Sequence, residues 1–337
     1  MVRPSQPDLE VVGVFNPGVI RHGREVVLLL RVAEAPPRRA EHEAAAPVYD
    51  PRTGALNVRR WDTRREVVDR SDPRTIVFEG RTWLTSISHL RVARSVDGVH
   101  FDVERQPALS AATELESFGL EDPRITLIDD TYWINYTAVS PYGIATALAS
   151  TRDFKAYRRH GVIFPPPNRD VTIFPIRIGG RYAALHRPMP EGIGEHAIWI
   201  GWSPDLMTWG DHDHVASARS GHWDDAKVGG GAVPFPVRVN GSDAWLAVYH
   251  GVSRSPRQYS LGALLLDTKD PGRVIGRSRA PILSPTAPYE REGFFKGVVF
   301  TCGVLAENGG VRVYYGAADG VTAVADVAID DILGDLD

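Results

Sequence analysis

Residues 122–150, DPRITLIDDTYWINYTAVSPYGIATALAS, contain three short segments rich in Ile, Val, Tyr, Trp and Thr that are separated by polar turns. The segments cover residues 122–128, 131–138 and 143–150, and their composition is typical of β-strands. The middle segment starts after a turn and ends in polar residues, and the third is built of smaller residues. The stretch therefore predicts a unit of consecutive β-strands.

This unit recurs along the chain. Strands similar to the middle segment are expected at 25–32, 181–187, 244–251 and 311–318. Each is preceded by another strand, at 14–20, 171–178, 231–239 and 297–305. Each is also followed by a strand of smaller residues, at 88–95, 196–203, 260–267 and 321–327. Successive strands of this last kind begin about 55, 53, 64 and 61 residues apart, which indicates an internal repeat.

Five copies of a four-strand unit, each too small to bury a core alone, predict an all-β fold, specifically a five-bladed β-propeller. We expect residues 1–337 to form one catalytic domain, with an insertion at about 33–87 in the first blade. Two stacked β-sandwiches are the alternative architecture, although a sandwich does not need such regular recurrence. Amphipathic helix is expected at 38–46 and 329–336.

Composition excludes several classes of protein. The 38 Lys and Arg against 42 Asp and Glu give a net charge of −4, so the basic surface that binds nucleic acid is not expected. The single cysteine, Cys302, cannot form an internal disulfide, and no apolar run approaches the roughly 20 residues of a membrane span. Residues 1–10 have no apolar signal core. We therefore expect a cytoplasmic protein that binds neither nucleic acid nor membrane.

Polar residues gather where the expected strands begin and end. The first strand of each unit begins at or close to one of the polar segments 15–18, 121–124, 168–170 and 227–231. The second strand of a unit ends near Arg31, Arg187, His250 or Asp319. In a propeller these positions meet at one mouth of the central channel. Arg31, Arg187, Lys227 and His250 would repel one another there unless an anion sits between them, and Arg suits bidentate contact with phosphate. The alternative is a salt-bridge network in which Asp122, Asp170 and Asp319 neutralise them.

The sequence resembles glycoside hydrolase family 130, the β-mannoside phosphorylases and their hydrolytic relatives. The matching strings run in order over about residues 14–330: FNPG at 15–18, LLLRV at 28–32, GLEDPRIT at 119–126, LHRP at 185–188, KVGGG at 227–231, YHGV at 249–252, DPGRVIGR at 270–277, PIL at 281–283, YE at 289–290 and VYYGAAD at 313–319. The string SISHLRVARS at 86–95 is most similar to the β-1,2-mannobiose and β-1,2-oligomannan phosphorylases.

The resemblance implies a five-bladed propeller and assigns roles to individual residues. Asp122 would be the single proton donor, acting on the bridging oxygen through the 3-hydroxyl of the bound mannosyl unit. Asn16, Asn168 and Asp319 would hold the mannosyl ring, and Arg31, Arg187, Lys227 and His250 would bind phosphate. Arg169 stands where the family pattern would have Lys.

The expected chemistry depends on what faces Asp122. Inverting cleavage needs an acid for the leaving oxygen and a nucleophile on the opposite face of the sugar ring. Water as nucleophile needs a second carboxylate as base, whereas phosphate is already anionic and needs cations to position it. The basic residues therefore favour phosphorolysis to α-mannose 1-phosphate, with inorganic phosphate as co-substrate and no cofactor. Burial and Glu121 would raise the pKa of Asp122, and Arg124 would lower it.

Three alternatives remain at this point. The chain could be an inverting β-mannosidase of the same family, a non-catalytic sugar-binding propeller, or a propeller glycosidase acting on furanosides. The last has a carboxylate-rich site, which fits the basic residues poorly. No metal is expected, because His212 and His214 are better explained by a solvated turn than by a ligand pair. The resemblance also allows a homo-oligomer.

Overall fold

The strand β10 (Thr131–Ser140) shows why the segments quoted above form sheet. Its sequence TYWINYTAVS is buried along most of its length, because β-branched and aromatic side chains fill both faces of the sheet. It pairs antiparallel with β9 (Gly119–Ile128) on one side and with β11 (Gly143–Thr151) on the other. The three segments are consecutive strands, as predicted.

The computed structural model describes residues 2–337. Across this range the regular structure is almost entirely β-strand, and the helical elements are short: η1 (Glu114–Glu116), α1 (Pro288–Arg291) and α2 (Ile329–Gly334). The predicted all-β class is therefore confirmed, and so is the predicted C-terminal helix. In the described part of the chain, no helix has the length and apolar character needed to cross a bilayer.

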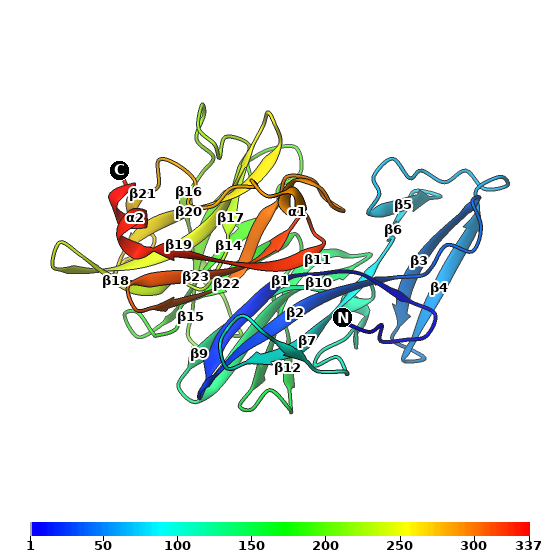
Figure 1. The fold of residues 1–337 in the computed structure, drawn as a ribbon, viewed down its shortest axis with the longest axis horizontal. Helices are drawn as coiled ribbons and strands as arrows, with labels where there is room; N and C mark the ends of the chain where they lie inside the picture. Colours follow the sequence, from blue (N-terminus) through cyan, green and yellow to red (C-terminus); the bar gives the residue numbers. More distant parts are fainter. Residues whose placement is uncertain (1) are drawn as a thin grey trace.

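Within residues 2–337 the strands of the main body form five antiparallel meanders in chain order (Figure 1). The first has β1 (Glu10–His22), β2 (Glu25–Ala35), β7 (Ile87–Ser95) and β8 (Asp102–Val103), and the second has β9, β10, β11 and β12 (Arg158–Phe164). The third has β13 (Asn168–Ile173), β14 (Tyr182–Pro188), β15 (Ile198–Ser203) and β16 (Gly210–Ala216).

The fourth meander places β17 (Lys227–Gly230) and β18 (Phe235–Val239) one after the other along β19 (Ser242–Ser253), followed by β20 (Gln258–Asp267) and β21 (Val274–Arg277). The fifth has β22 (Val299–Glu307), β23 (Gly310–Ala317) and β24 (Val321–Ala328). In the described chain this last meander has three strands, so the expectation of four strands in every copy is wrong. A parallel bridge between Ser88 and Gly119 joins the first two meanders.

Buried hydrophobic clusters lie between consecutive meanders. The first and second meanders enclose a cluster with Leu29 and Ile134, and the second and third enclose one with Leu148 and Ile173. Similar clusters lie between the third and fourth meanders and between the fourth and fifth. A further cluster joins Leu28 of the first meander to Tyr314 of the fifth. Each meander therefore packs its apolar faces against two neighbours, and the series closes on itself.

The segment between β2 and β7 forms two hairpins outside the meanders, β3 (Glu43–Asp50) with β4 (Ala55–Asp62) and β5 (Thr75–Phe78) with β6 (Arg81–Leu84). Figure 1 shows them projecting from one side of the body. The helix expected at 38–46 is wrong, because alternate residues of β3 point inward, where Ala44 and Ala46 pack in a small core with Trp61. Strand pairing and this aromatic core outweigh the helix propensity of the alanines.

Candidate active site

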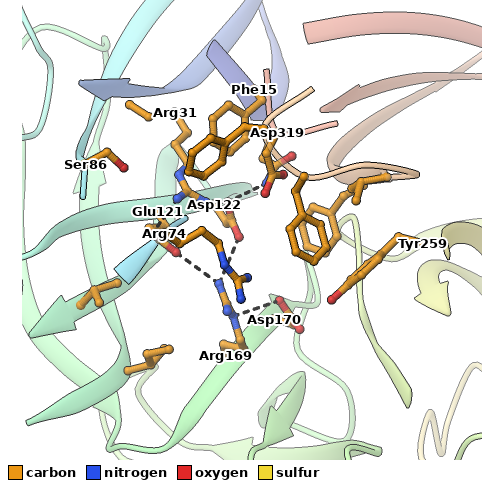
Figure 2. Close-up of a pocket in the computed structure, with 18 of the residues that line it drawn as sticks. Phe15, Arg31, Arg74, Ser86, Glu121, Asp122, Arg169, Asp170, Tyr259 and Asp319 are labelled. Atoms are coloured by element: carbon orange, nitrogen blue, oxygen red, sulfur yellow. Dashed lines mark hydrogen bonds and ion pairs between the residues drawn. The ribbon is translucent and has the colours of Figure 1, made fainter. Parts of the chain in front are cut away.

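A pocket of about 250 Å³ opens where the innermost strands of the meanders converge (Figure 2). Of the eight residues that the sequence assigns to the site, seven line this pocket: Asn16, Arg31, Asp122, Arg187, Lys227, His250 and Asp319. They come from β1, β2, β9, β14, β17, β19 and the turn after β23. Residues separated by up to about 300 positions in the chain thus meet at one site, which the repeat predicts.

β-Bulges direct three polar side chains toward the pocket. The pairing of β1 with β2 shifts between Phe15 and Gly18, and equivalent shifts occur where β9 and β13 pair with their neighbours. At these bulges Asn16, Asp122 and Asp170 have φ angles of 49°, 48° and 56°. Asn and Asp tolerate this left-handed conformation better than most residues do. The bulge therefore explains why the first two positions read Asn-Pro and Asp-Pro, which sequence reasoning interprets as ordinary turns.

Asp122 is buried and held by three partners. Asn16 Nδ2 donates to its Oδ1 at 2.9 Å, Arg31 Nη1 donates to the same oxygen at 2.9 Å, and Arg169 Nη2 lies 3.4 Å from Oδ2. Burial raises the pKa of Asp122, but Arg31, Arg169 and Arg124 together lower it by more, so the pKa lies below its ordinary value. The carboxyl group is therefore ionised in the unliganded protein, and the arginines decide the balance that the sequence leaves open.

Close packing around Asn16 requires glycine on a neighbouring strand. A Cβ added to Gly316 of β23 would lie 2.0 Å from Asn16 Oδ1, well inside van der Waals contact. Gly316 is the glycine of the string VYYGAAD, and the side-chain amide of Asn16 occupies the space that a Cβ at this position would need. This contact also shows that the fifth meander supports the side chain that binds Asp122.

Glu121 and Arg31 extend the network beside Asp122, as Figure 2 shows. Arg31 Nη2 lies 2.6 Å from Glu121 Oε1, and Arg169 Nη2 lies 3.3 Å from Glu121 Oε2. The Arg31 guanidinium also stacks over the ring of Phe15, with its Cζ 4.6 Å from the ring centroid. Both carboxylate oxygens of Glu121 are thus engaged by guanidinium groups.

Asp170 organises a second group of basic residues. Arg187 Nε and Nη2 lie 2.7 and 2.6 Å from Asp170 Oδ2, and His250 Nε2 lies 3.8 Å from the same oxygen. Burial raises the pKa of Asp170, but Arg187 and the other basic neighbours lower it by more, so it lies well below the ordinary value. Burial lowers the pKa of His250 to about 3, against the opposing effect of Asp170. His250 is therefore neutral near pH 7, and the expectation that it acts as a fourth cation is wrong.

The glycines of KVGGG allow this cluster to form. A Cβ on Gly229 would lie 2.4 Å from His250 Cε1, 2.7 Å from Arg187 Nε and 2.7 Å from Asp170 Oδ2. The backbone of β17 must therefore pass close to all three side chains. The carbonyls of Gly230 and Gly231 accept hydrogen bonds from Arg124 at 3.2 and 3.0 Å, which fixes this fully buried guanidinium.

Lys227 and Tyr259 complete the side of the pocket nearest Arg187. The Lys227 ammonium lies 4.8 Å from the centroid of the Tyr259 ring. Burial lowers the pKa of Lys227, and the nearby Arg187 and Arg169 lower it further. Burial raises the pKa of Tyr259, but Lys227 and Arg257 lower it by more, so it lies below the ordinary value. Tyr259 is the second residue of β20, and nothing in its local sequence predicts a role in the site.

Asp319 lines the pocket near Arg31, in the turn between β23 and β24, with a φ of 51°. Burial raises its pKa to about 6, and the nearby Asp122 and Glu121 contribute in the same direction although Arg31 opposes them. Two carboxylates in one pocket therefore differ in pKa: that of Asp122 lies below its ordinary value, whereas Asp319, with a pKa of about 6, is mostly ionised at pH 7 and becomes protonated just below it.

Asn168 is the predicted residue that does not line the pocket. Its side chain is buried, with Nδ2 3.0 Å from His186 Nδ1, and its Oδ1 has no hydrogen-bond partner within residues 2–337. The next residue, Arg169, reaches the pocket instead. His186 Nε2 in turn contacts His212 Nδ1 at 3.0 Å, and both His212 and His214 lie on β16 rather than in a turn. In the described chain no group of three or more His, Cys, Asp or Glu is arranged to hold a metal ion.

The two projecting hairpins also contribute to the pocket. Arg74 and Thr75, at the start of β5, line it together with Leu84 and Ser86. Arg74 Cζ lies 4.9 Å from the centroid of the Phe295 ring, so the hairpin side chain crosses to the segment before the fifth meander. The sequence of the 33–87 segment does not reveal this contribution, because the pocket is formed only when the segment folds back.

The charges of the pocket are unequal in the described structure. The carboxylates that line it are Glu121, Asp122, Asp170 and Asp319, and the basic side chains are Arg31, Arg74, Arg169, Arg187 and Lys227. The salt-bridge network considered as an alternative does exist, since Asp122 and Asp170 each hold guanidinium groups. It does not cancel the positive charge, however, because five basic groups face four carboxylates. An anion would stabilise this arrangement.

An all-β scaffold with a pocket edged by aromatic rings, in which basic groups surround the buried carboxylates of Asp122 and Asp170, is typical of an enzyme that binds a sugar together with an anion. The chain belongs to glycoside hydrolase family 130, because the family model described as beta-1,4-mannooligosaccharide phosphorylase matches residues 63–337. This finding confirms the resemblance noted from the sequence motifs.

Individual relatives agree with this assignment. The chain is 44% identical over 340 residues to the beta-1,2-mannobiose phosphorylase of Listeria innocua, covering 100% of this chain and 94% of that protein. It is 39% identical over 251 residues to the 1,2-beta-oligomannan phosphorylase of a Thermoanaerobacter species, covering 73% of this chain and 80% of the relative. The solved structure of the Listeria innocua enzyme in complex with beta-1,2-mannobiose superposes with a TM-score of 0.93, covering 99% of this chain and 94% of that chain.

Proposed function

We propose that this chain is an inverting phosphorylase of β-mannosides. It cleaves β-1,2-mannobiose or β-1,2-oligomannan with inorganic phosphate and releases α-mannose 1-phosphate and a shortened sugar. The relatives named above support this substrate class. The observation that carries the proposal is the excess of basic side chains around Asp122 in a pocket of about 250 Å³.

The pocket geometry supports a division of roles. Asp122 protonates the bridging oxygen, and Asn16 and Asp319 hold the mannosyl ring beside it. Arg31, Arg187, Lys227 and His250 bind phosphate, as the family resemblance implies, and the same geometry adds Arg169 and Tyr259 to this set. His250 is neutral and adds no charge: its Nδ1 donates its N–H to the Gly230 carbonyl at 3.2 Å, which leaves Nε2 as an acceptor for a protonated phosphate oxygen. Asn168 is left out of the sugar site, because its amide contacts His186.

Binding of phosphate allows Asp122 to take up from solvent the proton that it donates. In the unliganded pocket Arg31 and Arg169 lower the pKa of Asp122 and keep it ionised. A bound phosphate draws these guanidinium groups toward its own oxygens and places a second negative charge nearby. Both effects raise the pKa of Asp122, so the carboxyl group becomes protonated when the nucleophile arrives. Acid catalysis is thus coupled to occupancy of the anion site.

Hydrolysis is the less favoured alternative because it needs a carboxylate free to deprotonate water. Arg31 and Arg169 hold both oxygens of Glu121, and Asp170 is bound to Arg187. Asp319 is the remaining carboxylate lining the described pocket, and it belongs to the sugar side in this proposal. A furanoside glycosidase would need several acidic groups without such arginine partners. A non-catalytic sugar-binding protein would not need basic groups arranged around a buried acid.

We also infer that the five meanders are the blades of a propeller. Neighbouring inner strands contact one another in order, including β1 with β9 and β22 with β1, and a hydrophobic cluster fills each gap between meanders. Two stacked sandwiches would instead share one core between two facing sheets. The closed series of clusters supports the propeller, with the pocket at its axis.

The proposed reaction needs no cofactor, because phosphate is the nucleophile and Asp122 the acid. Its product is a sugar phosphate, whose charge opposes passage through a membrane. This supports a cytoplasmic location, where the product is retained. Formation of a homo-oligomer, which the family resemblance allows, is measurable by sedimentation of the purified protein.

One assay tests the central proposal. Purified protein is incubated with β-1,2-mannobiose in the presence and absence of inorganic phosphate, and the products are followed by proton and phosphorus NMR. We expect α-mannose 1-phosphate to appear only with phosphate and its anomeric configuration to be α from the first turnover. Equal release of mannose in phosphate-free buffer would establish a hydrolase and overturn the proposal.

A further inference from the structure

A second pocket lies next to the proposed phosphate-binding residues and shares Lys227 with the first. It has a volume of about 340 Å³ and is lined by His196, Ala226, Lys227, Val252, Ser253, Arg254 and Arg257. Lys227 lines both pockets, so its side chain forms part of the wall between them. We call this second pocket the basic vestibule.

Two further contacts connect the basic vestibule to the first pocket. His196 Nδ1 lies 2.9 Å from Arg187 Nη1, so a vestibule residue touches the guanidinium that Asp170 orients. Arg257 is close enough to the Tyr259 hydroxyl to help lower its pKa. The vestibule is therefore adjacent to Arg187, Lys227 and Tyr259, the three side chains that enclose the phosphate site on that side.

The charge of the basic vestibule differs from that of the first pocket. Lys227, Arg254 and Arg257 line it, and none of the described residues lining it is a carboxylate. The nearby Asp225 does not neutralise Arg254 through a carboxylate–guanidinium pair. Its Oδ1 accepts the backbone N–H of Arg254 at 2.8 Å, and its backbone carbonyl accepts Arg254 Nε at 3.0 Å. The positive charge is thus uncompensated and accessible, since Arg254 and Arg257 are exposed.

The size of the first pocket makes a second route useful. At about 250 Å³ it is below the roughly 300–1,000 Å³ common for small-molecule sites. A bound mannobiose would therefore occupy most of it. In an inverting displacement, phosphate must reach the face of the mannosyl ring opposite the leaving sugar. A path past Lys227 would bring phosphate in on the side of Arg187 and Tyr259, apart from the entrance used by the sugar.

We propose that inorganic phosphate enters through the basic vestibule, where Arg254 and Arg257 hold it before it passes Lys227 to the reaction site. This inference rests on the proposed phosphorolysis. It assigns a role in anion capture to two arginines outside the pocket that contains Asp122. Positive charges along such a path raise the rate at which an anion associates, and salt screens the effect.

The test compares Arg254→Gln, Arg257→Gln and the double variant with the unmodified protein. We expect kcat/KM for phosphate at saturating β-1,2-mannobiose to fall about threefold in each single variant and about tenfold in the double variant at low ionic strength. The values should converge in high salt, and kcat/KM for β-1,2-mannobiose at saturating phosphate should stay unchanged. Arg152→Gln is the matched control, because Arg152 is exposed in the turn after β11 and lines neither pocket.

The outcomes separate the two proposals. If the unmodified protein makes no mannose 1-phosphate, the proposed function is refuted, and the proposed route of phosphate entry is refuted with it. If it does, but the double variant keeps its kcat/KM for phosphate, or loses as much as Arg152→Gln does, the entry route alone is refuted. Arg254 anchors a turn to Asp225, so circular dichroism checks its folding. Arg257→Gln alone decides the question if the Arg254 variants do not fold.

Discussion

Replacing Gly229 by alanine tests the packing on which the proposed phosphate site depends. Gly229 lies on β17, and the added methyl carbon would lie 2.4 Å from His250 Cε1 and 2.7 Å from both Arg187 Nε and Asp170 Oδ2. Ordinary contacts of this kind are near 3.4–4 Å. The three side chains come from β19, β14 and β13 and are all buried, so they cannot simply turn into solvent.

The size of the effect follows from the overlap. Relief of these contacts requires shifts of about 1 Å in groups that hold the nucleophile, and a misplacement of about 1 Å costs on the order of 10²-fold in rate. Overpacking of a buried site also costs about 1–3 kcal/mol of stability. We therefore expect Gly229→Ala to lower kcat/KM for phosphate by roughly 10²-fold, and to lower the free energy of unfolding by about 1–3 kcal/mol.

Initial rates of mannose 1-phosphate formation over a range of phosphate concentrations give the first quantity, and urea unfolding gives the second. Gly210→Ala is the matched control, because a Cβ at Gly210 of β16 meets no atom within 4 Å and its φ is not positive. A Gly229→Ala variant with the phosphate kinetics and stability of Gly210→Ala would refute the reasoning. It would mean that Arg187, Asp170 and His250 are not packed against β17 as described.

Three further predictions concern carboxylates of the folded protein. Asp122→Asn should lower kcat by about 10²–10⁴-fold while β-1,2-mannobiose still binds in calorimetry, and a variant that keeps its turnover would exclude Asp122 as the acid. Asp319→Asn should be more stable to urea than the unmodified protein at pH 7 by about 1–2 kcal/mol, with the difference gone at pH 4. The sign follows because burial raises the pKa of Asp319 to about 6, so the folded protein loses stability as pH rises from about 4 through that value. Asp224→Asn should cost about 3–5 kcal/mol in urea unfolding, because it leaves the Arg219 and Arg277 charges beside a buried neutral amide. Its control is Asp326→Asn at an exposed pair with Arg312, where the expected loss is about 0–1 kcal/mol.

The proposed phosphate site also leads to a prediction about pH dependence. Burial lowers the pKa of His250 to about 3, so His250 should not titrate near pH 6.5. The pH dependence of kcat/KM for phosphate should therefore have the same shape in the unmodified protein and in His250→Gln. Rates measured between pH 5.5 and 8 for both proteins would check this. A step near pH 6.5 that disappears in the variant would contradict the burial of His250 beside Asp170.

Local sequence predicts the strands well because strand formation here depends on composition over a few residues. The segment 131–138 is apolar enough to be buried on both faces, and its recurrence is visible without any structure. The residues 38–46 show the limit of this approach. Their alanines favour helix, yet β3 forms there because Ala44 and Ala46 find a partner in Trp61 of the neighbouring strand. Such a partner is identified only when the hairpin has formed.

Sequence alone determined the all-β class, the repeat and the gathering of polar residues at strand ends, including Asp122, Arg31 and Arg187. Tertiary structure decided which atoms meet there. β-Bulges turn Asn16 and Asp122 toward the pocket. Arg169 lines the pocket, whereas its neighbour Asn168 does not, and distant segments of the chain supply Tyr259 and Arg74. It also decided charge, since the ionisation of Asp122, Asp319 and His250 depends on burial and on guanidinium groups a few ångströms away. Those distances arise from packing between meanders, which no local pattern of residues specifies.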